Sequence, residues 1–457
     1  MQLSHTAAAT FAVFDEPNLV SAAGLVPVLA LAGSAGLEQL AGRQLSVPTD
    51  KGANAGAKVA ALVAGMVAGA DSIEDMRLLR HGGMRRVFTG CYAPSTLGSF
   101  LRTFSFGHVR QLDAVAARFL AGLAAWAPLL PGQGTVVVDV DDTIVEVHGY
   151  AKQGAEFGYS KVRGLNALLA TASTAASAPV VVAQRLRKGA ANSARGAKRL
   201  IADALATVSR VTPGRPVLLR ADSAFYGADT ILTAVRAGVQ VSVTVRQDAR
   251  VKAAISGIPD QAWTPIAYRE AVFDEVSGRW ISRAEVAEVP YTAFASKTAR
   301  HRVPGRLVVR RIPELNPDGQ AGLFDLWRFH AFFTTSGLDT VAADQTHRGH
   351  AIIEQVHADL KNSALAHLPS GKFTANAAWL VLAVIAFNLT RAAAALTGPQ
   401  LAKVTTGTLR RTLIAVPARI ATSARRLVLH LPLAWPWQDA WHQLFTQTCG
   451  PPAAVTT

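Results

Sequence analysis

The segment 136–143, VVVDVDDT, constrains the fold more than any other stretch of this 457-residue chain. Its three adjacent valines favour a buried strand, because β-branched side chains pack well on a pleated sheet. Asp139, Asp141 and Asp142 follow directly. Buried carboxylates repel one another unless a cation neutralises them. The strand therefore ends either in a solvated turn or in a site that holds positive charge.

The register of this strand leaves the identity of such a ligand open. Side chains alternate along a strand, so Asp139 and Asp141 share one face and Asp142 points the other way. A second acid, Asp222, ends the buried strand that reads RPVLLRAD. Residues 131–249 predict the order β-β-β-α-β-α-β, an α/β mixed sheet. Since the ends of adjacent strands are neighbours, we expect Asp141 and Asp222 to meet at one edge of the sheet.

A third acid lies on a predicted helix from about Asp344 to Asn362. Its apolar residues form a stripe at helical spacing, and Glu354 lies beside that stripe. Lys361, seven residues later, lies on nearly the same face. Two aspartates and a glutamate without basic partners predict a Mg²⁺ site, because Mg²⁺ prefers a few carboxylate oxygens together with water and phosphate. Two such ions can activate a hydroxyl and stabilise a leaving oxygen in phosphodiester chemistry.

The composition narrows the class of partner. A formal net charge of +15 indicates a polyanion, either nucleic acid or an anionic membrane surface, with a generally basic surface as the alternative. The two cysteines, Cys91 and Cys449, lie far apart, so neither a disulfide framework nor a zinc site is expected. The longest late apolar run, 377–387, is interrupted soon afterwards by Asn388 and Arg391, which predicts a buried helix and no membrane span. We expect a cytoplasmic protein.

Changes in composition and hydrophobic pattern along the sequence predict five regions. They are a helical DNA-binding region (1–130), the first part of the α/β core (131–249), a β-rich insertion (250–336), the final helix of the core (337–372) and a basic, mostly helical C-terminal region (373–457). The short arginine-containing helices of the first region suit a helix-turn-helix unit, although an ordinary helical bundle fits the pattern equally well. A basic run is expected to follow DNA phosphates, with a solvated helix face as the alternative; it comprises Arg185, Arg187, Lys188, Arg195, Lys198 and Arg199.

These motifs, taken in order, resemble those of the DDE transposases of bacterial insertion sequences, which have an RNase H-like core. The matching pieces are VDVDDT, KQGAEFGYSKVRGLNALLA, LLRADSAFY, HRGHAIIEQVHADLKN and FTANAAWLVLAVIAFNLTRA. The similarity covers nearly the whole chain. It is greatest to the group with a β-rich insertion before the last catalytic helix and, within that group, to the insertion-sequence family numbered thirteen-eighty.

The resemblance implies roles for individual residues. Asp141, preferred by the D-x-T pattern, would hold two Mg²⁺ ions together with Asp222 and Glu354, with Mn²⁺ as a substitute. Lys361 keeps the family's E-x6-K spacing and would contact the DNA backbone. The family's Tyr and Arg positions are His347 and His350 here, with Arg348 between them. This departure leaves open how these three residues contact phosphate. Candidates for stacking on DNA, with core packing as the alternative, are Tyr159, Tyr226 and Trp327.

The expected function is cut-and-paste transposition. The protein would bind the terminal inverted repeats, cleave the ends, join the 3′-hydroxyls to target DNA and act as a homodimer on DNA in the bacterial nucleoid. The resemblance also allows a hairpin on the transposon end. Two alternatives remain: a metal-dependent nuclease of the same fold that never joins DNA, and a non-catalytic DNA-binding protein descended from a transposase.

Overall fold

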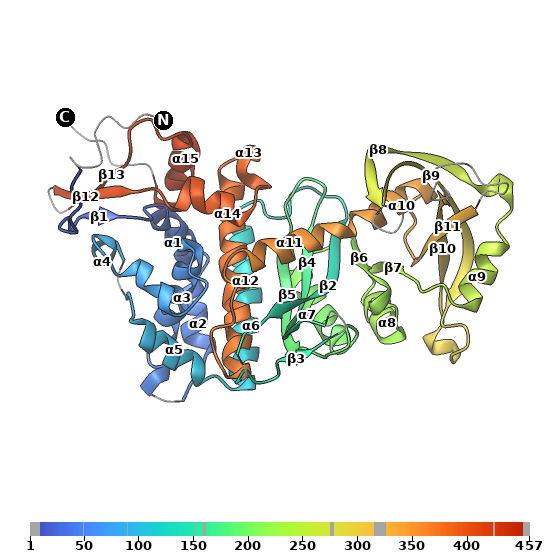
Figure 1. Ribbon diagram of the computed structural model, residues 1–457, viewed down its shortest axis with the longest axis horizontal. Helices are drawn as coiled ribbons and strands as arrows, with labels where there is room; N and C mark the ends of the chain where they lie inside the picture. The colour runs from blue at the N-terminus through green and yellow to red at the C-terminus, as the bar shows by residue number, and fades with distance from the viewer. Residues whose placement is uncertain are drawn as a thin grey trace.

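A computed structural model describes residues 10–48, 50–88, 90–149, 151–158, 161–274, 278–314, 326–423 and 426–450. A mixed sheet runs through its middle (Figure 1). A body of helices, built from the two ends of the chain, lies on one side of this core, and the insertion strands lie on the other. The predicted α/β fold with a mixed sheet is confirmed.

The core sheet has the order expected of an RNase H-like fold. Its strands are β2 (Val136–Glu146), β4 (Arg163–Ser173), β5 (Val180–Lys188), β6 (Val217–Ala221) and β7 (Gln240–Thr244), arranged as β5-β4-β2-β6-β7. Strand β4 is antiparallel to β2 and β5, while β6 runs parallel to β2 and β7. Helix α7 (Ala197–Val211) connects β5 to β6, and α8 (Ala228–Arg236) connects β6 to β7. The order β-β-β-α-β-α-β is therefore present, with one extra two-residue strand, β3 (Glu156–Phe157), beside β4.

Two glycines allow the backbones to approach closely where β4 meets β2 and β5. A Cβ added to Gly164 would lie 2.5 Å from the Val145 carbonyl oxygen. One added to Gly189 would lie 2.2 Å from the Gly164 carbonyl oxygen. Because real Cβ atoms do not approach backbone this closely, only glycine fits at either position without displacing a strand.

The insertion extends the core sheet. After helix α9 (Ala249–Ser256) come β8 (Thr264–Asp274), β9 (Arg279–Ala293), β10 (Val303–Glu314) and β11 (Leu326–Thr334). Strand β11 pairs antiparallel with β7, and the order continues β11-β10-β9-β8. The segment predicted as a separate β-rich region thus shares one continuous sheet with the core (Figure 1).

The predicted helix from Asp344 to Asn362 is divided in two. Helix α10 (Thr340–Arg348) and helix α11 (Ile352–Lys361) are joined by a 3₁₀ turn, Gly349–Ala351. Arg220 of β6 donates to the carbonyl oxygens of Thr346 and Gly349 at this turn. A Cβ on residue 349 would lie 2.5 Å from the Arg220 Nη1. The break therefore occurs where a buried arginine of the sheet binds the helix backbone.

The terminal regions fold together around one central helix. The N-terminal region contributes α1 (Leu25–Ser34), α2 (Leu37–Gln44), α3 (Ala55–Ala68), α4 (Met84–Val87), α5 (Pro94–Arg102) and α6 (Phe106–Trp126). The C-terminal region contributes α12 (Phe373–Leu396), α13 (Pro399–Ala402), α14 (Thr406–Leu409) and α15 (Gln438–Cys449). Strand β1 (Leu19–Val20) pairs with β12 (Ala418–Ser423), which pairs with β13 (Arg426–His430). Helix α12 packs against α6, α3 and β5.

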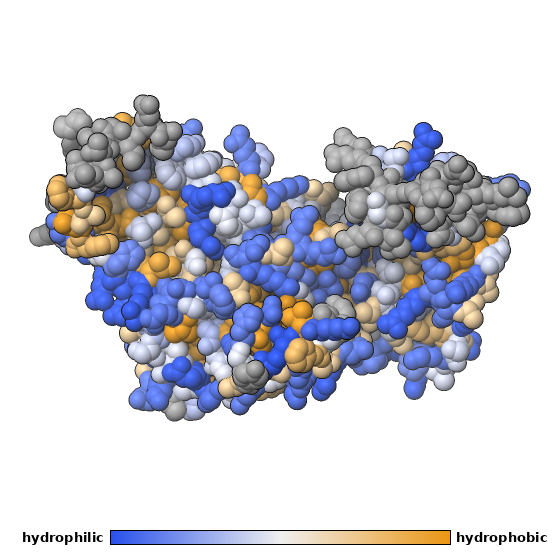
Figure 2. All heavy atoms as spheres, in the orientation of Figure 1, coloured by the Kyte–Doolittle hydropathy of each residue, from blue (hydrophilic) through white to orange (hydrophobic). Residues whose placement is uncertain are grey.

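Helix α12 is long and apolar enough to cross a membrane, as is the bent pair α1 and α2 by the same measure of length and composition. Almost all of α12 is buried inside the protein, as predicted. The two residues that interrupt its apolar run anchor it there. Asn388 exchanges two hydrogen bonds with the Val181 backbone of β5, and Arg391 pairs with Asp359 of α11 at 2.9 Å. Figure 2 shows mainly hydrophilic residues on one face of the molecule, with hydrophobic ones in separate patches.

Candidate active site

Asp141 and Asp222 are brought together by the parallel pairing of β2 and β6. Val140 lies opposite Ala221, which is the last pair of this ladder, and Asp141 and Asp222 are the next residues along each chain segment. Neighbouring strands lie about 4.8 Å apart, so successive pairs across them are close neighbours. Strand β6 ends at Ala221, whereas β2 continues to Glu146. The prediction that Asp141 ends its own strand is therefore wrong. Asp141 lies within β2, beside the end of the neighbouring strand β6.

Burial and mutual repulsion make this pair of acids difficult to ionise. Burial raises the pKa of Asp141 to about 7, and the charges of Asp222 and Asp142 act in the same direction against a hydrogen bond from the Asp142 N–H. Burial likewise raises the pKa of Asp222, with a hydrogen bond from the Ala224 N–H opposing it. A cation placed between the two carboxyl groups would favour their ionised forms.

Helix α11 and the turn before it lie over these acids and contact β2 at two positions on one helical face. His350 and His357 are seven residues apart, so they occupy the same face two turns apart. The Nδ1 atom of His350 lies 2.8 Å from Asp139 Oδ1, and the Nδ1 atom of His357 lies 3.7 Å from Asp141 Oδ2. Burial lowers the pKa of His357 to about 4, and the nearby Lys361 lowers it further.

Glu354 lies between these two histidines on the same face. Its side chain is exposed, and no contact joins it to either aspartate within the described residues. In the part of the chain that the structure describes, no three His, Cys, Asp or Glu side chains are close enough to hold a metal ion. The structure thus brings together two of the three predicted acids and places the third on the helix that covers them.

Asp139 does not share the situation of Asp141. It is buried and forms two hydrogen bonds with Arg220: Nε donates to Oδ1 and Nη2 to Oδ2, each at 2.7 Å. The same guanidinium binds the turn between α10 and α11, and His350 contacts the same carboxylate. Arg220 therefore joins β2, β6 and the helices above them. The signal for it was an arginine inside the otherwise apolar strand VLLRA, which the sequence reasoning passed over.

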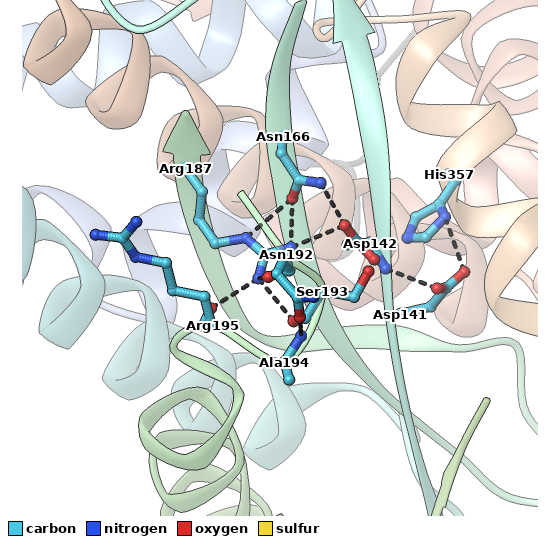
Figure 3. Close-up of polar contacts among 9 residues, drawn as sticks. All are labelled: Asp141, Asp142, Asn166, Arg187, Asn192, Ser193, Ala194, Arg195 and His357. Carbon is cyan, nitrogen blue, oxygen red and sulfur yellow. Dashed lines mark hydrogen bonds and ion pairs between the residues drawn. The ribbon is translucent and has the colours of Figure 1, made fainter. Parts of the chain in front are cut away.

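On the opposite face of β2, Asp142 is held by a second arginine (Figure 3). The Nη2 atom of Arg187 donates to Asp142 Oδ2 at 2.8 Å and to Asn166 Oδ1 at 2.6 Å. Its Nη1 atom donates to the carbonyl oxygens of residues 192, 193 and 195. The Asn166 side chain also donates to Asp142. Asp141 points the other way, toward His357.

This arrangement corrects the prediction that Arg187 contacts DNA. Its side chain is 6% exposed, and its donors are directed to Asp142, Asn166 and the loop that precedes α7. A guanidinium engaged in this way holds the loop against the sheet and has no donor left for a phosphate. Lys188 and Arg195, which were predicted with it, are exposed, and Lys188 lies 3.8 Å from Glu156.

His347 is also corrected. Its Nδ1 lies 2.9 Å from Ser242 Oγ and its Nε2 lies 3.0 Å from Thr244 Oγ1, both on β7. The ring stacks on Phe332 with centroids 4.0 Å apart. Burial and the positive charges around it lower the pKa of His347 to about 3. A neutral ring with both nitrogens occupied serves packing between α10 and the sheet and is not a phosphate ligand.

The remaining predicted contacts are more accessible. Arg348 is one-third exposed, donates to Asp344 at 2.8 Å and lies over the Tyr268 ring. Lys361 lies half-buried at the end of α11, and burial lowers its pKa. The Nδ1 atom of His350 lies within hydrogen-bond distance of Asp139.

The predicted aromatic contacts are occupied inside the protein. Trp327 and Trp263 each lie 4.3 Å from the Arg311 guanidinium. Tyr226 stacks on Phe294 of the insertion, with centroids 5.2 Å apart. These contacts agree with core packing as the alternative to DNA stacking. Tyr159 lies outside the described residues.

Comparison with known proteins gives one extended match. A family model for the transposase DDE domain, group 1, matches residues 8–448. No curated protein matches the chain. Among solved structures, the chain is similar to one from a cryo-EM structure of the piggyBac transposase synaptic complex with hairpin DNA. That match has 10% identity and a TM-score of 0.42, and it covers 85% of this chain and 79% of the other. Because the family model spans nearly all of the sequence, this protein belongs to the DDE transposase domain family, group 1.

Proposed function

We propose that this protein is the transposase of a bacterial insertion sequence, of the family numbered thirteen-eighty. It binds the terminal inverted repeats, cleaves the DNA at the ends of the element and joins the released 3′-hydroxyls to target DNA. The observation that carries this proposal is the pair of acids, Asp141 and Asp222, which directly follow the last paired residues of β2 and β6 and influence each other's charge.

Asp141, Asp222 and Glu354 would hold two Mg²⁺ ions, with Mn²⁺ as a substitute. The donor set fits a hard cation, because Asp141 and Asp222 present carboxylate oxygens without an arginine or lysine partner in the described part of the chain. Their neighbours, Asp139 and Asp142, are each paired with an arginine. When bound, the metal would activate a water or a 3′-hydroxyl and stabilise the leaving oxygen of the phosphodiester.

Glu354 completes the site by moving its side chain alone. The helix that carries it is fixed at both ends, by His350 on Asp139 and by Asp359 on Arg391 and Thr406. The Glu354 side chain is exposed, so it can change rotamer without losing buried contacts. The fixed helix keeps the carboxyl group within a small volume above β2, which limits the conformational entropy lost on metal binding.

DNA would contact basic side chains at two places. Near the acids, the exposed or half-buried residues Lys188, Arg195, Arg348 and Lys361 provide positive charge. In the N-terminal region, a surface hollow of about 640 Å³ beside the start of α5 is lined by Arg77, Arg80, Arg85 and Arg102. This hollow supports the assignment of inverted-repeat binding to the N-terminal helices.

The test is cleavage of labelled duplexes that carry the inverted repeats found beside the coding region. Full-length protein is expected to cut them with Mg²⁺ and not with EDTA, and Asp222→Ala is expected to remove the activity while DNA binding persists. Asp229→Ala, which changes an exposed aspartate on α8, serves as the matched control.

Precleaved ends offered with a target plasmid separate the alternatives. Joined product supports a transposase, whereas nicking without joining indicates a nuclease. Cleavage that survives Asp222→Ala would contradict the proposed site. Because transposition pairs two ends, we also propose that the protein forms a homodimer on DNA, measurable as the mass of the complex in light scattering.

A further inference from the structure

His357 is placed against the first acid of the proposed site. It lies on the face of α11 that covers β2, and its Nδ1 is 3.7 Å from Asp141 Oδ2. The other oxygen of that carboxylate, Oδ1, accepts the Asp142 N–H at 2.7 Å. The carboxylate is therefore bound on one side by the Asp142 backbone and faces the imidazole on the other. A shift of about 0.7 Å would bring the imidazole within hydrogen-bond distance.

The surroundings of His357 are those of a residue kept for its polar atoms. The side chain is 6% exposed, yet Nε2 is buried without a hydrogen-bond partner in the described residues. An unpaired buried acceptor or donor costs roughly 1–3 kcal/mol, so an apolar side chain of similar size would stabilise α11 better. Stability of the helix alone does not account for a histidine here.

The helix that carries His357 is fixed in position over the sheet by contacts on both sides of this residue. Two residues further on, Asp359 accepts hydrogen bonds from the Thr406 N–H and Oγ1 and pairs with Arg391. One turn before Glu354, His350 contacts Asp139. His357 thus approaches Asp141 from a rigid support, as expected of a side chain that orients a ligand.

We propose that His357 is a positioning residue, which holds the Asp141 carboxylate in one orientation beside Asp222 so that the pair binds a divalent cation. Resting on the proposed function, this assignment adds a residue of α11 to the three acids. His357 acts through Asp141 and not on the DNA.

The test is Mn²⁺ binding to the full-length protein without DNA, measured from the EPR signal of free Mn²⁺. Replacing His357 by Leu is expected to raise the dissociation constant about ten-fold or more, as the loss of groups that orient metal ligands does elsewhere. An Asn at this position puts an amide nitrogen where Nδ1 was and should stay within about three-fold of the wild type. A Gln puts its amide where Nε2 was and should resemble Leu.

Two controls separate positioning from folding. Val356→Ala removes a neighbouring buried side chain of α11 without touching Asp141, so it should lower the melting temperature and leave Mn²⁺ affinity unchanged. Asn and Gln carry the same amide and differ by one methylene group, which changes where the amide lies, so that pair decides the question even when the Leu variant does not fold.

The outcomes also distinguish this inference from the function on which it rests. Equal Mn²⁺ affinity of the Asn, Gln and Leu variants and the wild type would overturn the role of His357 alone. If the wild-type protein binds Mn²⁺ no more tightly than the Asp222→Ala variant, the metal site itself is overturned.

Discussion

Two adjacent aspartates of β2 lie in opposite environments. On one face, Asp142 is buried against Arg187 and Asn166, and its charge is neutralised by groups of the chain. On the other face, Asp141 lies beside Asp222. Among the basic side chains that the structure describes, only His357 of α11 lies within 4 Å of its carboxylate. The first arrangement stabilises the fold. The second leaves two acidic groups without an arginine or lysine partner, which is the arrangement expected of a cation site.

The buried acids around the site follow the first pattern. Asp139 pairs with Arg220, and Asp359 pairs with Arg391. The first pair joins β2 to β6 and reaches the turn before α11, and the second joins α11 to α12. The pair Asp141 and Asp222 has no arginine partner among the described residues, which is the arrangement we expect of a pair that binds a ligand.

The largest effect is expected from Asp141→Asn. Loss of a metal-binding oxygen should slow cleavage of inverted-repeat DNA on the order of 10³-fold or more, since several kcal/mol of transition-state stabilisation is removed. Thermal stability without metal should stay equal or rise, because the repulsion with Asp222 is relieved. Cleavage rates and melting curves measured together check both statements. A variant that is destabilised but still cleaves DNA would contradict the assignment of Asp141 to metal binding.

Asp142→Asn should have the reverse effect. It leaves the Arg187 guanidinium buried without its counter-charge, a loss that costs about 3–5 kcal/mol in unfolding free energy. Urea unfolding measures this, with Asp229→Asn as the exposed control, which is expected to stay within about 0.5 kcal/mol of the wild type. If Asp142→Asn left stability unchanged and removed metal binding, Asp142 and not Asp141 would be the metal ligand of β2.

The lowered pKa of His347, on α10, predicts that the stability of the protein depends on pH. The folded pKa of His347 is lowered to about 3, so its unfolded form takes up a proton below about 6.5 while the folded form does not. This contribution is fully present above pH 6.5 and is lost as the pH falls toward 3. The slope is about 1 kcal/mol per pH unit within that range. His347→Gln should remove this part of the slope in urea unfolding measured at pH 4 and 7. An unchanged slope would show that folding does not lower the pKa of His347.

The smallest effect concerns the exposed basic residues next to Arg187. Replacing Lys188 and Arg195 together by Ala should leave unfolding free energy within about 0.5 kcal/mol of the wild type. DNA affinity should fall modestly, and the slope of log affinity against log salt should decrease by about 1–2. Fluorescence anisotropy at several salt concentrations measures this. An unchanged slope would remove these two side chains from the DNA-contacting surface.

Local patterns in the sequence were sufficient for the element types and for the neighbourhood of Asp141 and Asp222. The β-branched runs predicted the core strands, and acids following two parallel strands predicted their meeting. The pairing of β11 with β7 could not be predicted, because register between distant strands depends on which edges remain open after the core forms. The break at Gly349 also escaped prediction, because its cause is Arg220, more than a hundred residues away.

The basic residues show the same division most clearly. Arg187, Lys188 and Arg195 look alike in the sequence, and all three were expected on DNA. Only the fold shows that Arg187 turns inward to Asp142 while the other two face solvent. The sequence by itself determined the α/β class, the excess of positive charge and the order of the three acids. The tertiary structure decided which acids have arginine partners, since a charge pair requires side chains from separate strands to meet, and their distance along the chain does not specify that meeting.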